Sequence, residues 1–182
     1  MTEMRNLLLD PRPFTAVKWT AKGDMLTVAR YDNDRLFLQT KQDSSDVYAY
    51  TRLTLPVGTY RFGAEISAPQ VSFAPNALRF IRLNPVQEML NATWAGVPGR
   101  YVTSPNALTE QTQVELRVMC GPQANSAVWY RHLFLMAEDD YQHMIGKCGV
   151  IWFCGASYES AGGGLPPSRL HAYPHLDLEV CA

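Results

Sequence analysis

Hydrophobic and polar residues alternate along several short stretches of the chain. In TLPVGTYRFGAEIS, residues 54–67, every second position after a Pro/Gly turn is Tyr60, Phe62, Ala64 or Ile66. A period of two is the pattern of a β-strand that buries one face and exposes the other to water. The stretch is therefore predicted to be a strand that contributes its aromatic side chains to a core.

Further strand-like segments are short, and turn residues such as those of YDNDR and CGPQANS separate them. With the stretch above, the predicted strands cover residues 25–28, 35–40, 47–53, 59–66, 78–83, 114–120 and 128–136. No window of eleven or more residues keeps a helical period with a cap and a stop, so helix content should be low. The nearest is NPVQEMLNATW, residues 84–94, which is interpreted as one helical turn or an irregular loop.

Many short strands with turn residues between them predict an all-β protein, and a jelly-roll-like β-sandwich closes two such sheets economically. The residue composition changes after about Tyr141, because ESAGGGLPPSRLHAYPHLD holds three consecutive glycines and three prolines. This high frequency of glycine and proline predicts an irregular Pro/Gly-rich C-terminal arm that wraps over a surface or reaches a neighbour. We therefore expect a jelly-roll β-sandwich over residues 1–142 and an extension over residues 143–182.

Composition and charge reduce the number of function classes that fit the chain. Hydrophobic residues make up 47% of the 182 residues and charged residues 18%, which is typical of a globular chain. The formal net charge of −1 gives no field to attract nucleic acid or an anionic membrane, so neither is an expected partner. The chain has no apolar run long enough for a membrane span and no secretory signal pattern at its start.

Four cysteines lie at irregular spacing without a C-x-x-C pair, so zinc is not expected. They are Cys120, Cys148, Cys154 and Cys181. Free buried thiols are the favoured reading, since cysteine packs as a small hydrophobe, and a disulfide near the C-terminus is the alternative.

Three motifs in order resemble the carbohydrate-binding-module-like jelly rolls of bacteriophage tail and other virion proteins. The motifs are NLLLDPRPFTAVKWT, LTLPVGTYRFGAEIS and VWYRHLFLMAEDD, and VIWFCGASY is similar to a "YFDG" element that follows such modules, with Cys154 in the place of the aspartate. The matching positions are Asn6, Leu7, Leu8, Pro11, Phe14, Trp19, Leu55, Pro56, Gly58, Thr59, Tyr60, Phe62, Trp129, Leu133 and Leu135.

The resemblance covers residues 6–160 and implies a non-catalytic β-sandwich used for attachment or assembly. Within it, Trp19, Tyr60, Phe62 and Trp129 are assigned to the core. Self-association into a trimer or larger ring is implied by the resemblance alone.

Exposed aromatic residues would let such a sandwich hold a sugar, because a pyranose can lie its C–H groups on a ring face. The glycan-binding candidates are Tyr48 and Tyr50, on one face of a predicted strand, and Trp94 and Tyr101, in the loop-like NATWAGVPGRYV. Core packing or a subunit contact is the preferred interpretation for all four.

Catalytic and metal-binding constellations are not expected. The histidines do not combine with Ser or Cys in a known nucleophile motif, and AGGGLPPS lacks the lysine of a phosphate loop. The acidic run AEDD, residues 137–140, could ligate a hard cation, but a solvated strand edge is the preferred interpretation. No enzyme activity, cofactor or metal is therefore predicted.

Two hypotheses of function follow. The first is a phage virion structural protein, a tail component or capsid decoration, made in the host cytoplasm and bound to itself and to other virion proteins, with attachment to a host-surface glycan as a further role. The second is a stand-alone carbohydrate-binding module or adhesin.

Overall fold

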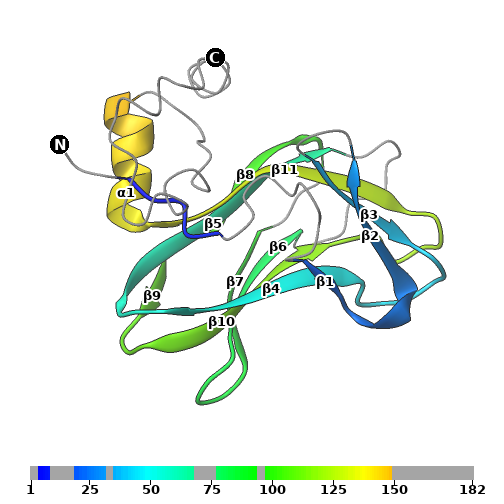
Figure 1. The fold of residues 1–182 in the computed structure, drawn as a ribbon, viewed down its shortest axis with the longest axis horizontal. Helices are drawn as coiled ribbons and strands as arrows, with labels where there is room; N and C mark the ends of the chain where they lie inside the picture. The colour runs from blue at the N-terminus through cyan, green and yellow to red at the C-terminus, as the bar shows by residue number, and fades with distance from the viewer. Residues whose placement is uncertain (1–3, 9–18, 32–34, 68–76, 94–96, 149–182) are drawn as a thin grey trace.

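The computed structural model describes residues 4–8, 19–31, 35–67, 77–93 and 97–148. They form two antiparallel β-sheets that pack face to face (Figure 1). The first sheet has the order β1 (Thr20–Ala21), β4 (Tyr48–Leu55), β10 (Thr112–Met119), β6 (Leu78–Arg82) and β7 (Glu88–Thr93). The second has the order β2 (Leu26–Tyr31), β3 (Arg35–Thr40), β11 (Ala127–Ala137), β5 (Gly58–Ser67) and β8 (Gly99–Val102), with β9 (Asn106–Leu108) also paired to β5.

The predicted all-β sandwich is confirmed, and its core follows from the alternation in the sequence. In β5, Tyr60, Phe62, Ala64 and Ile66 are all at most 4% exposed. They belong to one hydrophobic cluster with alternate residues of β10 in the other sheet, such as Leu116. Each sheet therefore turns one face of every strand to a shared core and the other face outward.

All seven predicted strand ranges coincide with strands, to within a few residues at their ends. The interpretation of residues 84–94 as a helical turn or loop is wrong, because Glu88–Thr93 is strand β7. Its register with β6 shifts so that Asn91 pairs with Phe80 and Met89 with Ile81, which leaves Leu90 as an extra residue. This β-bulge interrupts the period of two and hides the strand from a pattern search.

Three of the four aromatic residues assigned to the core are buried there, namely Trp19, Tyr60 and Phe62. The assignment of Trp129 to the core is wrong. Its neighbours Val128 and Tyr130 point inward, so Trp129 lies on the outer face of the second sheet, partly exposed. There its ring centroid is 5.9 Å from that of Phe37.

A short helix, α1 (Glu138–His143), follows β11 directly and continues into a π-helical turn, Met144–Cys148. It lies beside β5 on the outer side of the second sheet (Figure 1). The predicted boundary after residue 142 falls within this helical segment, and Met144 beyond it is fully buried. The Pro/Gly-rich arm stays a prediction, because residues 149–182 lie outside the described residues.

Cys120 is a free thiol buried at the end of β10, and burial raises its pKa. Its Sγ contacts the carbonyl oxygens of Ser126 and Leu38 at 3.3 and 3.7 Å. Within the described part of the chain, no helix is long and apolar enough to cross a membrane.

Candidate functional site

The outer face of the first sheet carries a compact group of tyrosine, arginine and carboxylate side chains. The alternation that turns Ala49 and Leu53 of β4 toward the core turns Tyr48, Tyr50 and Arg52 outward. We call this surface the tyrosine–arginine face. Its residues are Lys22, Asp46, Tyr48, Tyr50, Arg52, Arg79, Glu115 and Arg117. Among the described residues no helix packs over it, whereas α1 lies against β5 and β11 of the second sheet.

Glu115 of β10 is the centre of one of two ion-pair groups on this face. Its carboxylate accepts hydrogen bonds from Nε of Arg52 at 2.7 Å and from Nε of Arg117 at 2.5 Å. Antiparallel pairing places Glu115 directly opposite Arg52, and Arg117 follows two residues along the same strand. The Glu115 side chain is only 2% exposed, so the two guanidinium groups supply the charge compensation that water would otherwise provide.

A second carboxylate, Asp46, joins two further cations. It accepts a hydrogen bond from Nζ of Lys22 at 2.7 Å and from Nη1 of Arg79 at 3.2 Å. Burial would raise the pKa of Asp46, but the hydrogen bond from Lys22 and the charges of Lys22, Arg79 and Arg117 lower it below its usual value. Asp46 therefore stays ionised and keeps Lys22 and Arg79 at one end of the face.

The two tyrosines lie among these cations. Arg117 and Lys22 lie over the Tyr48 ring, with Cζ and Nζ 4.3 and 5.0 Å from its centroid, and Arg52 Cζ is 4.9 Å from the centroid of Tyr50. The two rings meet edge to face with centroids 6.1 Å apart. Cation–π contacts of this kind hold both rings and guanidinium groups in fixed positions on the sheet.

The structure brings together two of the four predicted glycan-binding residues. Tyr48 is 6% exposed and packs with Met119 and Tyr50 in a small cluster separate from the main core, while Tyr50 is half-buried. Tyr101 is on β8 of the second sheet, where it packs against the main core and donates a hydrogen bond from its hydroxyl to the Val97 carbonyl at 2.6 Å. Trp94 lies outside the described residues.

Sequence reasoning missed the charged residues around the tyrosines. A signal was present, since Arg52 has the same strand phase as Tyr48 and Tyr50, and Glu115 and Arg117 have the outward phase of β10. The sequence alone does not show that these residues form one surface, because this depends on the register between β4 and β10. Alternating charges in a strand otherwise indicate only a face in water.

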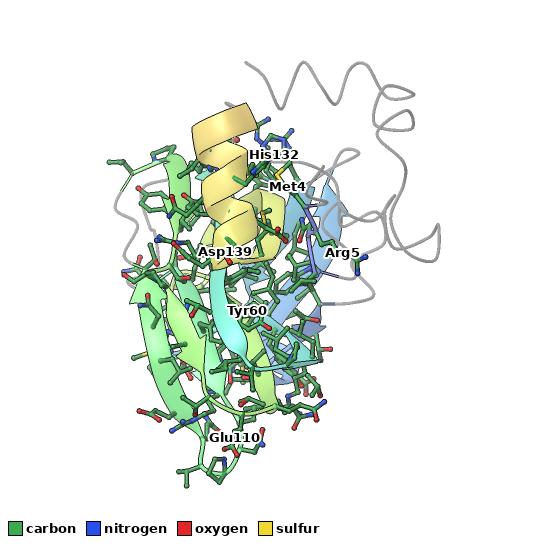
Figure 2. The ribbon with its side chains drawn as sticks, turned by 90° about the vertical axis from the view of Figure 1, so that its left-hand side faces the viewer. Met4, Arg5, Tyr60, Glu110, His132 and Asp139 are labelled. Carbon is green, nitrogen blue, oxygen red and sulfur yellow. The ribbon has the colours of Figure 1, made fainter. Side chains whose placement is uncertain are left out.

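A separate cavity of about 420 Å³ opens near α1, lined by Arg5, Leu7, Leu53, Thr54, Leu55, Pro56, Tyr60, Ala137 and Asp140. Figure 2 shows Arg5 and Tyr60 on this side of the sandwich, with Glu110 at the opposite end. The backbone N–H of Arg5 donates to Asp140 Oδ2 at 3.2 Å, and burial raises the Asp140 pKa. In the described residues no group of three His, Cys, Asp or Glu side chains could hold a metal ion.

No protein-family model and no curated protein sequence matches the chain. Solved structures with a similar fold include carbohydrate-binding modules. A family 4 module has a TM-score of 0.51 at 12% identity, covering 72% of this chain and all of the module. The xylan-binding family 22 domain of Paenibacillus barcinonensis Xyn10C has a TM-score of 0.50 at 12% identity, covering 75% of this chain and 97% of the domain.

A third match is the family 22 and xylanase modules of Clostridium thermocellum Xyn10B, complexed with xylohexaose. The TM-score is 0.54 at 8% identity, and the match covers 76% of this chain but 29% of that longer one. At such low identity the matches show the fold alone. The chain is a β-sandwich that resembles the jelly rolls of carbohydrate-binding modules.

Proposed function

We propose that this chain is a non-catalytic carbohydrate-binding module and that the tyrosine–arginine face is its glycan-binding surface. The observation that carries the proposal is the fixed arrangement of ring and guanidinium groups on neighbouring strands, held by the two shared carboxylates. The fold shared with carbohydrate-binding modules supports the same function class.

The chemistry of the face suits a saccharide. Sugar hydroxyls accept hydrogen bonds from guanidinium N–H groups, and the C–H side of a pyranose packs against an aromatic ring. The Arg52 side chain is 53% exposed and its pair with Glu115 uses Nε, so its Nη groups lie on the accessible part of the surface. Tyr50, half-buried beside Arg52, supplies the ring.

The two tyrosines are expected to contribute differently. Tyr48 is 6% exposed, so it acts as support that holds Arg117 and Tyr50 in place. Tyr50 is accessible enough to touch a ligand. Tyr48→Ala should therefore lower the free energy of unfolding by about 2–4 kcal/mol, as truncation of a buried aromatic side chain does, whereas Tyr50→Ala should chiefly affect binding.

The test is isothermal titration calorimetry with a panel of soluble neutral and acidic oligosaccharides. For the oligosaccharide that binds, Tyr50→Ala should weaken affinity by about 1 kcal/mol or more, because stacking on the ring is lost. Phe37→Ala, on the outer face of the second sheet, is the matched control and should leave affinity unchanged. Loss of binding in Phe37→Ala with full binding in Tyr50→Ala would move the site to the other sheet.

The other two predicted glycan contacts are tested in the same assay. Trp94 follows Thr93, the last residue of β7 at the edge of the first sheet, and Trp94→Ala would weaken binding if its ring joins the ligand surface. Tyr101→Ala should instead lower stability, since its ring packs on the core of the sandwich.

The virion location and self-association stay predictions that rest on the order of the sequence motifs. Quantitative mass spectrometry of purified particles tests the location. A copy number near that of the major capsid protein would indicate a decoration protein, a few copies a tail component, and absence a free binding module. Light scattering at high micromolar concentration tests self-association, and a mass equal to one chain would contradict it.

A further inference from the structure

We infer that the tyrosine–arginine face selects saccharides that carry carboxylate groups, such as uronic acid polymers. This inference rests on the proposed function and specifies its ligand class. The face holds the cations Lys22, Arg52, Arg79 and Arg117 but only the carboxylates Asp46 and Glu115. It therefore carries two excess positive charges in a chain whose formal net charge is −1.

The excess charge is concentrated because each carboxylate already serves two cations. Glu115 lies between Arg52 and Arg117, and Asp46 binds both Lys22 and Arg79. The Glu115 side chain is 2% exposed. Asp46, at 37%, is less exposed than Arg52 and Lys22, at 53% and 47%, and is held by two hydrogen bonds. An arriving anion therefore meets the cations first.

Two of the cations are accessible to a ligand. The side chains of Arg52 and Lys22 are 53% and 47% exposed, whereas Arg117 is 11% exposed and serves mainly to hold Glu115 and Tyr48. A carboxylate can accept two parallel hydrogen bonds from one guanidinium group, which a neutral hydroxyl cannot do. Arg52 is thus the residue that would distinguish an acidic sugar from a neutral one.

The position of Tyr50 links charge recognition to sugar recognition. Its ring centroid is 4.9 Å from Arg52 Cζ. A sugar unit that contacts this ring would bring a carboxylate at its edge within reach of the guanidinium group. Free acetate or phosphate would gain the charge interaction without the ring contact, so a polymer of acidic sugars fits the face better than a small anion.

The experiment compares oligogalacturonides with their fully methyl-esterified forms, which keep the sugar rings and lose the charge. Calorimetric titration should show the acid form binding at least about fivefold more tightly. The difference should shrink in about 0.5 M salt, because screening weakens attraction between exposed charges. Sodium acetate at matched carboxylate concentration is the small-anion control and should not compete.

Two matched charge-removing variants locate the effect. Arg52→Gln should weaken binding of the acid form more than binding of the ester, because the ester loses only hydrogen bonds to its hydroxyls whereas the acid form also loses the charge interaction. The two affinities should therefore become nearly equal. Arg35→Gln removes a cation from the second sheet, where Arg35 lies over Trp129, and should leave both affinities unchanged. Thermal unfolding checks that both variants fold, and in Arg52→Gln the Glu115 carboxylate keeps the hydrogen bond from Arg117 as its remaining charge partner.

The outcomes separate this inference from the proposed function. Equal affinity for acid and ester, or equal losses in Arg52→Gln and Arg35→Gln, would overturn the inference while leaving glycan binding intact. Competition by acetate would reduce the site to a general anion site and also overturn it. Failure of every oligosaccharide in the wider panel would overturn the proposed function itself.

Discussion

At the scale of single residues, Asn6 explains why the N-terminal segment stays on the sandwich. Its Nδ2 donates to the Leu133 carbonyl at 3.0 Å, and its Oδ1 accepts from the backbone N–H groups of Leu135 at 3.0 Å and Leu8 at 3.2 Å. The side chain is 1% exposed. One amide group thus satisfies three backbone groups where β11 departs from regular pairing.

Asn6→Ala should lower the free energy of unfolding by about 2–4 kcal/mol, because it leaves buried backbone donors and an acceptor without partners. Equilibrium urea unfolding measures the change. Asn6→Asp is the control of equal size, since it keeps the acceptor bonds but turns a carboxylate oxygen toward the Leu133 carbonyl, and it should also destabilise at neutral pH. An unchanged midpoint in both variants would mean that Asn6 does not anchor the segment.

The residue scale also shows what the sequence could predict of the site. The phase of β4 was enough to place Tyr48 and Tyr50 on one face. It could not show that Tyr48 is enclosed, because the enclosing groups come from Arg117, across a strand pair, and from Lys22, across a loop. Whether an aromatic residue is a ligand platform or a support therefore depends on neighbours distant in sequence.

At the scale of elements, β11 shows how a bulge changes which residues meet. The pairing of β11 with β5 shifts between Arg131 and Phe134, and His132 has a positive φ of 51°. As a result consecutive residues reach the same carboxylate, with Arg131 Nη2 and His132 Nδ1 at 2.5 and 3.1 Å from Glu65. A strict period of two would have sent them to opposite faces.

Gly63 lets α1 pack on the second sheet. A Cβ at this position would lie 2.3 Å from the Phe134 ring, which in turn stacks on Tyr141 of α1 with centroids 5.8 Å apart. Gly63→Ala should therefore push Phe134 away and destabilise the protein by about 1–3 kcal/mol. Thermal unfolding measures the loss.

Gly146→Ala is the matched control, since a Cβ there meets no atom within 4 Å, and it should be neutral or slightly stabilising. Equal stability of both variants would show that Phe134 does not depend on the missing side chain at Gly63. The loss should also appear in the near-ultraviolet circular dichroism of the stacked rings, because they change their packing.

Sequence patterns predicted seven strands to within a few residues at their ends. They missed the short strands β1, β8 and β9, and they failed at β7, where Leu90 is an extra residue, and at Trp129, which was assigned by motif although its neighbours Val128 and Tyr130 carry the inward phase. The errors at β7 and at Trp129 have one physical cause. Which face a strand residue occupies is set by local pairing, and hydrophobicity alone does not report it.

At the scale of the whole molecule, ion pairs on several elements give stability a common dependence on pH. The hydrogen bond from Arg61 is the main cause that lowers the pKa of Glu138. For Glu65, burial would raise the pKa, but the hydrogen bond and charge of Arg131, with His132, lower it. Asp46 is shifted in the same direction, whereas burial raises the pKa of Asp140.

A carboxyl group whose pKa is lower in the folded state binds protons more weakly there than in the unfolded chain. Its contribution to stability is therefore complete above the unfolded-state value, 4.5 for Glu138, and is lost as pH falls through the folded-state pKa. The free energy of unfolding should decline from about pH 4.5 downward. Asp140, with the opposite shift, offsets a part of this decline.

Glu138→Gln tests this dependence. The variant should be less stable than the wild type at pH 7, because the bidentate pair with Arg61 is lost, and should lose less stability between neutral and acid pH. Urea unfolding at a series of pH values provides both curves. Parallel curves would show that the Glu138 carboxylate does not contribute to the acid sensitivity.

The order of strands has a further consequence for how the chain is made. The central strands of both sheets, β10 between β4 and β6 and β11 between β3 and β5, are the last two strands of the described chain. A nascent chain that has reached residue 110 therefore contains the outer strands of both sheets but lacks the two central strands, β10 and β11. Its unpaired strand edges are open to other chains until both central strands emerge. We expect a fragment of residues 1–110 to aggregate on expression, whereas a soluble, folded fragment would show that the outer strands find a different arrangement without their centres.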